Sequence, residues 1–180
     1  WKPFGPIRKI TKSEGNKLFE LDNENALDLY KMYLGDQASG LPATGLLFPL
    51  NIKGDEEKDD RIRTLLSIDE NEKSMVFAGD IPIDAKAQFM RASTEELVDG
   101  AIHAAENTEL QSPDLAILVS CVGRKLVMKQ RVEEEVEAVQ QILGPNTVLT
   151  GFYSYGEICP SSEANFSALH NQTMTVTTFK

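Results

Sequence analysis

The stretch that decides the fold runs from residue 115 to residue 153 and reads LAILVSCVGRKLVMKQRVEEEVEAVQQILGPNTVLTGFY. It opens with a continuous apolar run from Leu115 to Val119, which is too short for a buried helix and typical of a buried strand. Apolar residues then recur at helical spacing from about Lys129 to Leu143, before Gly144-Pro145 ends the pattern. Thr147 to Tyr153 predicts a second strand, so the order favours a parallel strand pair joined by a right-handed crossover.

Further elements are expected on both sides of this unit. Ser93 and Glu96 have the spacing of a capping box, and Leu97, Ala101 and Ala105 follow on one apolar face, which predicts a helix. Gln172 to Phe179 predicts the last strand of the chain. Near the N-terminus, residues 6–12 and 17–22 flank Ser13-Glu-Gly-Asn16 and predict a hairpin. Asn23 is expected to cap a helix that runs from Asn25 to Leu34.

Short apolar segments between turn residues fill the rest of the first half. Strands are predicted at Leu46–Ile52, Arg61–Ile68, Ser74–Ala78 and Lys86–Arg91. Pro49 cannot donate to a ladder, so its segment is expected at a sheet edge or bulge. The acidic run Asp55–Asp60 is interpreted as a solvated loop. Together these elements predict an α/β domain with a mixed β-sheet and flanking helices. One arrangement that fits this pattern has two packed sub-sheets, formed by residues 1–92 and 93–180.

Composition excludes several classes of function. The 180 residues carry 18 basic and 28 acidic side chains, a net charge of −10, which disfavours nucleic acids and anionic membrane surfaces as partners. No apolar run reaches the ~20 residues of a membrane-spanning helix. The two cysteines, Cys121 and Cys159, match no paired metal or redox motif, so a reducing, cytoplasmic location is expected. Because the chain begins with Trp1, we interpret it as a fragment of a longer protein.

Polar residues follow the two strands that are expected to be parallel. Ser120-Cys-Val-Gly-Arg124 comes after the first strand and Gly151-Phe-Tyr-Ser-Tyr-Gly-Glu157 after the second, and in α/β sheets such ends meet at one edge. The chain's tail adds a histidine and an asparagine. The candidate ligand-binding residues are therefore Cys121, Arg124, Tyr153, Tyr155, Glu157, His170 and Asn171.

These residue types suit a small zwitterion. Arg124 could hold a ligand carboxylate and Glu157 an ammonium group, as in an amino acid. In the alternative interpretation, Arg124 and Glu157 pair with each other or with neighbours and the tyrosines only pack. The acidic run Glu133–Glu137, near the start of the predicted helix, is interpreted as a solvated face.

Two other kinds of chemistry remain open from the sequence. Cys121 with His170 and either Asn171 or Glu157 has the residue types of a thiol-dependent hydrolase or transferase. A free cysteine after a buried strand is more often an inert, small hydrophobic residue. A zinc site from Cys121, Cys159, His170 and Glu157 lacks any characteristic spacing, so no metal or other cofactor is predicted. Motifs for nucleotide binding, zinc proteases and serine hydrolases are absent from the sequence.

Several dispersed stretches resemble one known family. They are Ser13-Glu-Gly-Asn16, Ala26-Leu-Asp-Leu-Tyr30, Gly45-Leu-Leu-Phe-Pro-Leu50, Phe77-Ala-Gly-Asp80, Ser120-Cys-Val-Gly-Arg124, Gly151-Phe-Tyr-Ser-Tyr-Gly-Glu157 and Leu169-His-Asn-Gln-Thr-Met174. In this order they resemble the C-terminal part of the FIST domain, named for F-box and intracellular signal transduction proteins. The resemblance covers nearly all of residues 1–180 and implies that an N-terminal FIST half precedes them.

The resemblance implies a cytoplasmic sensory module rather than an enzyme. Such domains are proposed to bind small molecules such as amino acids. In bacteria they occur alone or joined to output domains, among them histidine kinases, diguanylate cyclases and chemoreceptor signalling segments. The leading hypothesis is therefore ligand-responsive signalling. The alternatives are a Cys121-dependent enzyme for small molecules and an acidic module that docks a partner protein.

Overall fold

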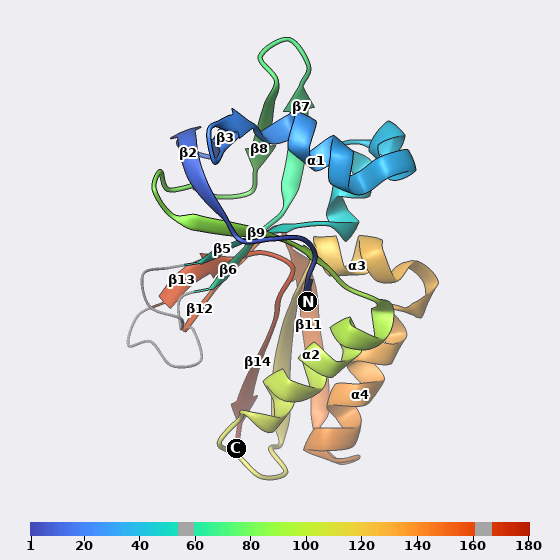
Figure 1. Ribbon diagram of the computed structural model, residues 1–180. Helices are drawn as coiled ribbons and strands as arrows, with labels where there is room; N and C mark the ends of the chain where they lie inside the picture. The colour runs from blue at the N-terminus through green and yellow to red at the C-terminus, as the bar shows by residue number, and fades with distance from the viewer. Residues whose placement is uncertain (54–59, 161–166) are drawn as a thin grey trace. The chain divides into compact units, whose positions relative to one another are not determined.

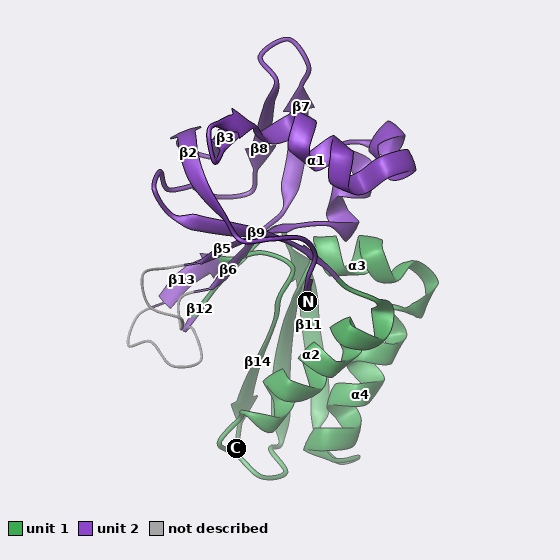
Figure 2. Ribbon diagram, in the orientation of Figure 1, with its two compact units in different colours: residues 1, 92–159, 170–180 green, residues 2–91, 160–169 purple. Residues whose placement is uncertain are grey.

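The computed structural model describes residues 1–53, 60–160 and 167–180, and the chain divides into two compact units (Figures 1 and 2). Unit 1 contains residues 1, 92–159 and 170–180, and unit 2 contains residues 2–91 and 160–169. The units differ from the predicted halves, 1–92 and 93–180, in the assignment of residues 1, 92 and 160–169. No helix in the described part of the chain is long and apolar enough to span a membrane.

Unit 2 is built on an antiparallel sheet. Its strands are β1 (Lys2–Pro3), β2 (Arg8–Glu14), β3 (Lys17–Leu21), β4 (Glu24–Asn25), β5 (Leu50–Lys53), β6 (Arg61–Arg63), β7 (Leu65–Asp69), β8 (Ser74–Phe77) and β9 (Lys86–Arg91). The order is β6-β5-β9-β2-β3-β8-β7, with β1 paired to β9 and β4 to β3. The predicted hairpin is confirmed as β2 and β3, and β9 has the predicted bounds.

Helix α1 (Ala26–Leu34) packs its apolar side into the core of unit 2, and the short 3₁₀ helices η1 (Gly35–Gly40) and η2 (Ala43–Leu47) follow it. The predicted cap at Asn23 is wrong. Asn25 caps the helix, since its side chain accepts from the Asp28 amide at 2.9 Å. Asn23 has a φ of 67° and lies in the tight turn between β3 and β4, a conformation that asparagine tolerates well.

Two strand predictions in unit 2 need correction. The predicted strand Leu46–Ile52 is a strand only from Leu50, because residues 46 and 47 belong to η2. The observed strand, β5, begins after Pro49 and pairs with both β6 and β9, so it lies inside the sheet and not at an edge. Pro49 itself contributes only a carbonyl, which accepts from the Met90 amide. The predicted strand Arg61–Ile68 is two strands that part at Thr64, where pairing changes from β5 to β8. Of the acidic run, residues 55–59 lie outside the described residues.

Unit 1 carries the mixed sheet that the sequence predicted. Strands β10 (Leu115–Cys121) and β11 (Val148–Ser154) are parallel, in register from Leu115 opposite Val148 to Cys121 opposite Ser154. Strand β14 (Met174–Phe179) pairs antiparallel with the other side of β10. Strands β12 (Glu157–Pro160) and β13 (Ser167–His170) form a separate two-stranded sheet, of which Pro160 and residues 167–169 are assigned to unit 2. The α/β fold class and the parallel pair are therefore confirmed.

Helices α2 (Thr94–Glu106) and α4 (Glu133–Leu143) lie on one face of this sheet (Figure 1). Their apolar sides meet β10 in a core of Ala101, Ala105, Ala116, Leu118, Val139, Leu143 and Met174. The capping box of α2 is confirmed, with both the Ser93 and Glu96 hydrogen bonds present. The predicted helix from Lys129 starts at Glu133 instead, after the 3₁₀ turn η3 (Lys129–Arg131).

A further helix, α3 (Val122–Met128), follows β10 directly, where the sequence predicted a loop. Its cap residue, Cys121, makes no side-chain capping hydrogen bond, so the usual N-terminal signal is missing. It ends at Lys129, which has a φ of 55° at a position where glycine is usual. The second predicted loop is also shorter than expected, because Gly151 to Ser154 belong to β11 and Glu157 begins β12.

Candidate functional site

Ser120 and Cys121 end β10 and direct their side chains to opposite faces, because successive residues of a strand alternate. The Ser120 hydroxyl meets Glu135 of α4, on the helix-covered face. The Cys121 thiol lies on the other face, where Glu157 is its neighbour. Four of the seven predicted residues therefore separate into two groups. Arg124 and Tyr153 belong to what we call the Glu135 group (Ser120, Arg124, Glu135, Tyr153), and Cys121 and Glu157 to the Cys121 group (Cys121, Ser154, Glu157, Thr173).

A buried ion pair forms the centre of the Glu135 group. Arg124 donates to one carboxylate oxygen of Glu135 through Nε at 3.0 Å and Nη2 at 2.8 Å, while the Ser120 hydroxyl donates to the other at 3.0 Å. The Nη2 atom also donates to the Leu97 carbonyl at 2.7 Å. The side chains of Arg124 and Glu135 are 4% and 0% exposed. A buried pair needs such additional hydrogen bonds to offset the cost of removing both charges from water.

This ion pair corrects two expectations about the site. Glu135 lies in the run interpreted as a solvated face, yet its carboxylate is fully buried. Arg124 pairs with this neighbour, as the alternative interpretation had it. The network thereby joins β10, α2, α3 and α4, because Ser120, the Leu97 carbonyl, Arg124 and Glu135 each come from a different element.

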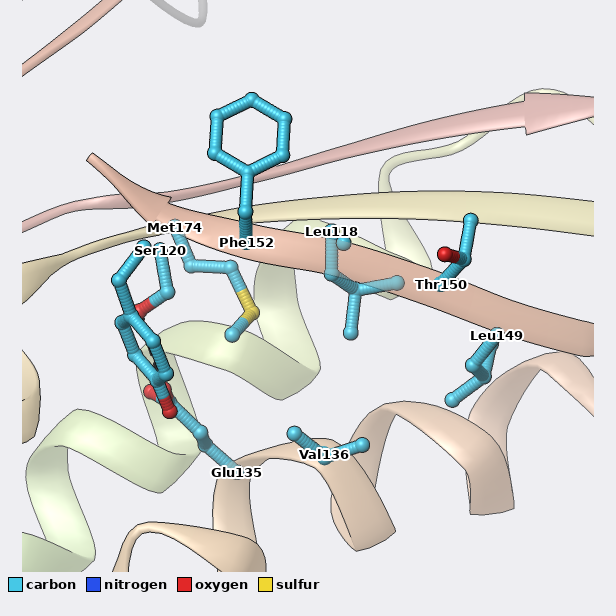
Figure 3. A pocket seen from close by; sticks show the side chains of 10 residues that line it. Leu118, Ser120, Glu135, Val136, Leu149, Thr150, Phe152 and Met174 are labelled. Carbon is cyan, nitrogen blue, oxygen red and sulfur yellow. Dashed lines mark hydrogen bonds between the residues drawn. The ribbon is translucent and has the colours of Figure 1, made fainter.

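An apolar pocket of about 260 Å³ adjoins the Glu135 group, between the β10–β11 pair and α4. Its walls are formed by Leu118, Ser120, Glu135, Val136, Leu149, Thr150, Gly151, Phe152, Tyr153 and Met174. Figure 3 shows Leu118, Leu149 and Met174 directed from the sheet toward α4, with Val136 facing them from the helix. The ring of Phe152 points away from the helix.

Gly151 is required where β11 passes the pocket. A Cβ atom at this position would lie 1.9 Å from the Leu118 carbonyl oxygen, far inside van der Waals contact. Because side chains alternate along a strand, Gly151 shares the helix-facing side with Leu149 and Tyr153. The missing side chain leaves room between them, which contributes to the hollow.

Tyr153 marks the polar end of the pocket. It is paired with Ser120 across the parallel strands, and 37% of its surface is exposed. The Lys125 ammonium lies 4.7 Å from the ring centroid, in a cation–π contact. Burial and the nearby Glu135 carboxylate raise the pKa of the Tyr153 hydroxyl, while Arg124 acts in the opposite direction. At neutral pH this hydroxyl is therefore a neutral donor at the pocket's edge.

The Cys121 group is a hydrogen-bonded cluster around a buried carboxylate. Glu157 is 4% exposed and accepts from the Ser154 hydroxyl at 2.5 Å and the Thr173 hydroxyl at 2.7 Å. Burial above all, and then the Glu157 carboxylate, raise the pKa of the Cys121 thiol, although the Gln172 and Gly123 backbone amides oppose this. A nucleophilic cysteine needs a lowered pKa, so this geometry does not favour thiol catalysis.

The remaining predicted residues lie apart from the pocket lining. His170 and Asn171 are buried, and the Asn171 side-chain amide donates to the His170 carbonyl. Tyr155 is 89% exposed, so its side chain is in solvent. In the described residues no cluster of three His, Cys, Asp or Glu side chains has the arrangement of a metal site.

Sequence reasoning missed Glu135, Val136, Leu118 and Leu149 as site residues. A signal for Glu135 was present, because it lies three and four residues before Ala138 and Val139 and so shares their apolar face. A carboxylate on that face predicts a buried cationic partner. Nothing in the sequence indicated the hollow itself, which depends on how α4 lies over the sheet.

Comparison with family models identifies the chain. The model of the FIST C domain matches residues 26–160, which include all of β10, α3, α4 and β11. The chain belongs to the FIST C domain family. FIST domains are associated with signal transduction and are not a known enzyme family. None of the curated proteins or solved structures compared with the chain matches it.

Proposed function

We propose that this FIST C domain senses a small molecule in the pocket between β10, β11 and α4 and passes the binding event to an output domain. The proposal depends chiefly on the composition of that pocket, in which apolar walls adjoin the Glu135 carboxylate and the hydroxyls of Ser120 and Tyr153. Small-molecule sites commonly have this composition, with few polar groups that fix the orientation of an apolar ligand. The signalling association of the family agrees with it.

An amino acid with an apolar side chain is the ligand that this pocket suits best. The volume of about 260 Å³ accommodates a molecule of that size. Its side chain would pack among Leu118, Leu149 and Val136. Its ammonium group would donate to Glu135 in an arrangement of α4 that uncovers this carboxylate, whose side chain is 0% exposed in the structure. A carboxylate offers about four acceptor sites, and the described bonds occupy three. Lys125, at the Tyr153 ring, is the cation placed to attract the ligand carboxylate, because Arg124 is engaged by Glu135.

The Glu135 network offers a route from binding to signalling. A ligand that donates to Glu135 changes the charge balance of the ion pair joining β10 with three helices. Binding shifts a conformational equilibrium only if the ligand has different affinities for the two states. Two arrangements of α4 over the sheet, with the pocket open in one of them, would supply that difference.

The other candidate residues have different parts in this proposal. Tyr153 contacts the ligand, and Arg124 acts through Glu135. A structural part, outside the pocket, belongs to the buried residues Cys121, Glu157, His170 and Asn171, and Tyr155 has no part. From the family resemblance we take the output to be a histidine kinase, a diguanylate cyclase or a chemoreceptor segment, in the bacterial cytoplasm.

A thermal-shift screen of the chain and of a variant whose pocket is filled tests the proposal. The melting temperature is measured with leucine, isoleucine, valine, methionine and phenylalanine, and with aspartate and lysine as polar controls. A ligand at ~100 times its dissociation constant adds about 2.7 kcal/mol to the free energy of unfolding. Val136→Trp should abolish the shift by filling the pocket. Ile142→Trp is its matched control on the same helix, since the two residues are 39% and 41% exposed and only Val136 lines the pocket.

The outcomes separate the alternatives. A shift with apolar amino acids that Val136→Trp removes and Ile142→Trp retains supports the site. A shift that persists in Val136→Trp would place the ligand elsewhere. If none of the amino acids produces a shift, the amino acid proposal is wrong, and a module that docks a partner protein becomes the better hypothesis.

A further inference from the structure

Strand β11 forms an edge of the sheet in unit 1, and among the described residues β10 is its single neighbouring strand. The Val148 amide donates to the Asp114 carbonyl at 2.9 Å, toward β10. In a parallel pair, alternate residues direct both backbone groups to the neighbouring strand. Leu149, Gly151 and Tyr153 therefore direct their N–H and C=O groups away from β10, to the outer side of β11.

This edge lacks the features that usually prevent strand pairing. Proteins protect exposed edges with charged side chains, prolines or bulges, whereas β11 reads VLTGFYS and pairs with β10 in unbroken register. Two of its apolar residues are also exposed, Val148 at 62% and Phe152 at 64%. Figure 3 shows Phe152 on the face of the sheet opposite α4. Within residues 1–53, 60–160 and 167–180, the strand thus combines outward backbone groups that pair with no other strand with exposed apolar surface.

We propose that two copies of this chain associate through β11, antiparallel about a two-fold axis at Gly151. Gly151 then pairs with Gly151 of the second copy, and Leu149 with Tyr153, so that the outward backbone groups of both strands are satisfied. On the exposed face, Phe152 lies opposite Thr150 and Val148 opposite Ser154. The two three-stranded sheets become one continuous sheet.

Charge favours a second copy over other partners at this edge. The chain has a net charge of −10, so two copies repel each other over much of their surface. The seven residues of β11 carry no charged side chain, so here two copies can approach without a like-charge contact within the strand pair. A basic partner would find no carboxylate on this strand to pair with. A neutral strand with exposed apolar residues is complementary to a copy of itself.

Sedimentation velocity tests this association. We expect the 180-residue chain to form a dimer whose fraction rises with concentration between micromolar and hundreds of micromolar, and rises with salt as the net repulsion is screened. Phe152→Lys places a charge beside the edge and should give a monomer, as should Val148→Lys. Met32→Lys is the matched control in α1, with 65% exposure against 64% for Phe152, and should dimerise like the unchanged chain.

Circular dichroism of each variant verifies that it is folded. A chain that stays monomeric over the whole concentration range overturns the proposal, and so does a dimer that both Phe152→Lys and Val148→Lys leave intact. Because this measurement needs no ligand, its failure leaves the pocket experiment unaffected.

Discussion

Removing Arg124 should destabilise unit 1 more than any change on its surface. In Arg124→Leu the Glu135 carboxylate loses hydrogen bonds of 3.0 and 2.8 Å and keeps the Ser120 hydroxyl at 3.0 Å. With a side chain that is 0% exposed, Glu135 has no direct access to water. Breaking a buried pair in this way typically costs about 3–5 kcal/mol, because an uncompensated charge remains inside. Urea denaturation, followed by circular dichroism, measures this loss.

The double variant Arg124→Leu/Glu135→Leu distinguishes the ion pair from simple packing. With both charges removed, we expect the free energy of unfolding to recover by at least about 2 kcal/mol relative to Arg124→Leu alone. Arg131→Leu serves as the control, because Arg131 also pairs with two carboxylates, Glu95 and Glu134, but is 47% exposed. Its loss should be much smaller. The role of the ion pair would be refuted if Arg124→Leu lowered the free energy of unfolding by less than about 1 kcal/mol. It would also be refuted if the losses measured for Arg124→Leu and Glu135→Leu separately added up to the loss in the double variant.

Two further predictions concern glycines and the buried thiol. Gly151→Ala should lower the free energy of unfolding by about 1–3 kcal/mol, because its Cβ would lie 1.9 Å from the Leu118 carbonyl oxygen. Gly100→Ala, inside α2, should raise the free energy of unfolding by about 0.5–1 kcal/mol, because its Cβ would meet only the Arg124 side chain, at 3.7 Å. Equal effects of the two variants in urea denaturation would contradict this. Burial raises the pKa of Cys121 above its ordinary 9.0, so the folded state retains the thiol proton that the unfolded chain releases. The free energy of unfolding should therefore fall as pH rises above 9.0, less steeply in Cys121→Val, and an unchanged slope would show that another group titrates.

Local signals predicted most elements of the fold. The capping box at Ser93, the apolar run at Leu115 and the Gly144-Pro145 stop each determine a boundary through neighbouring residues alone, and each is confirmed. The prediction failed at α3, whose ends at Cys121 and Lys129 lack the usual capping residues. This helix forms although its local signals are weak. It packs against β10, and its residue Arg124 is buried and paired with Glu135.

The candidate site likewise has some features that neighbouring residues predict and others that depend on contacts between residues far apart in the chain. The sequence predicted a parallel strand pair that places Ser120, Cys121 and Tyr153 near strand ends, because the apolar pattern indicates each strand, and alternation indicates which residues share a face. The structure showed that the two strands are neighbours and set their register. Only the tertiary structure decided that Arg124 would pair with Glu135 and that Glu157 would accept hydroxyls near Cys121. Those choices depend on which buried charges come within hydrogen-bond distance after α4 packs on the sheet. Packing of this kind joins residues far apart in the chain, and so no short stretch of sequence contains it.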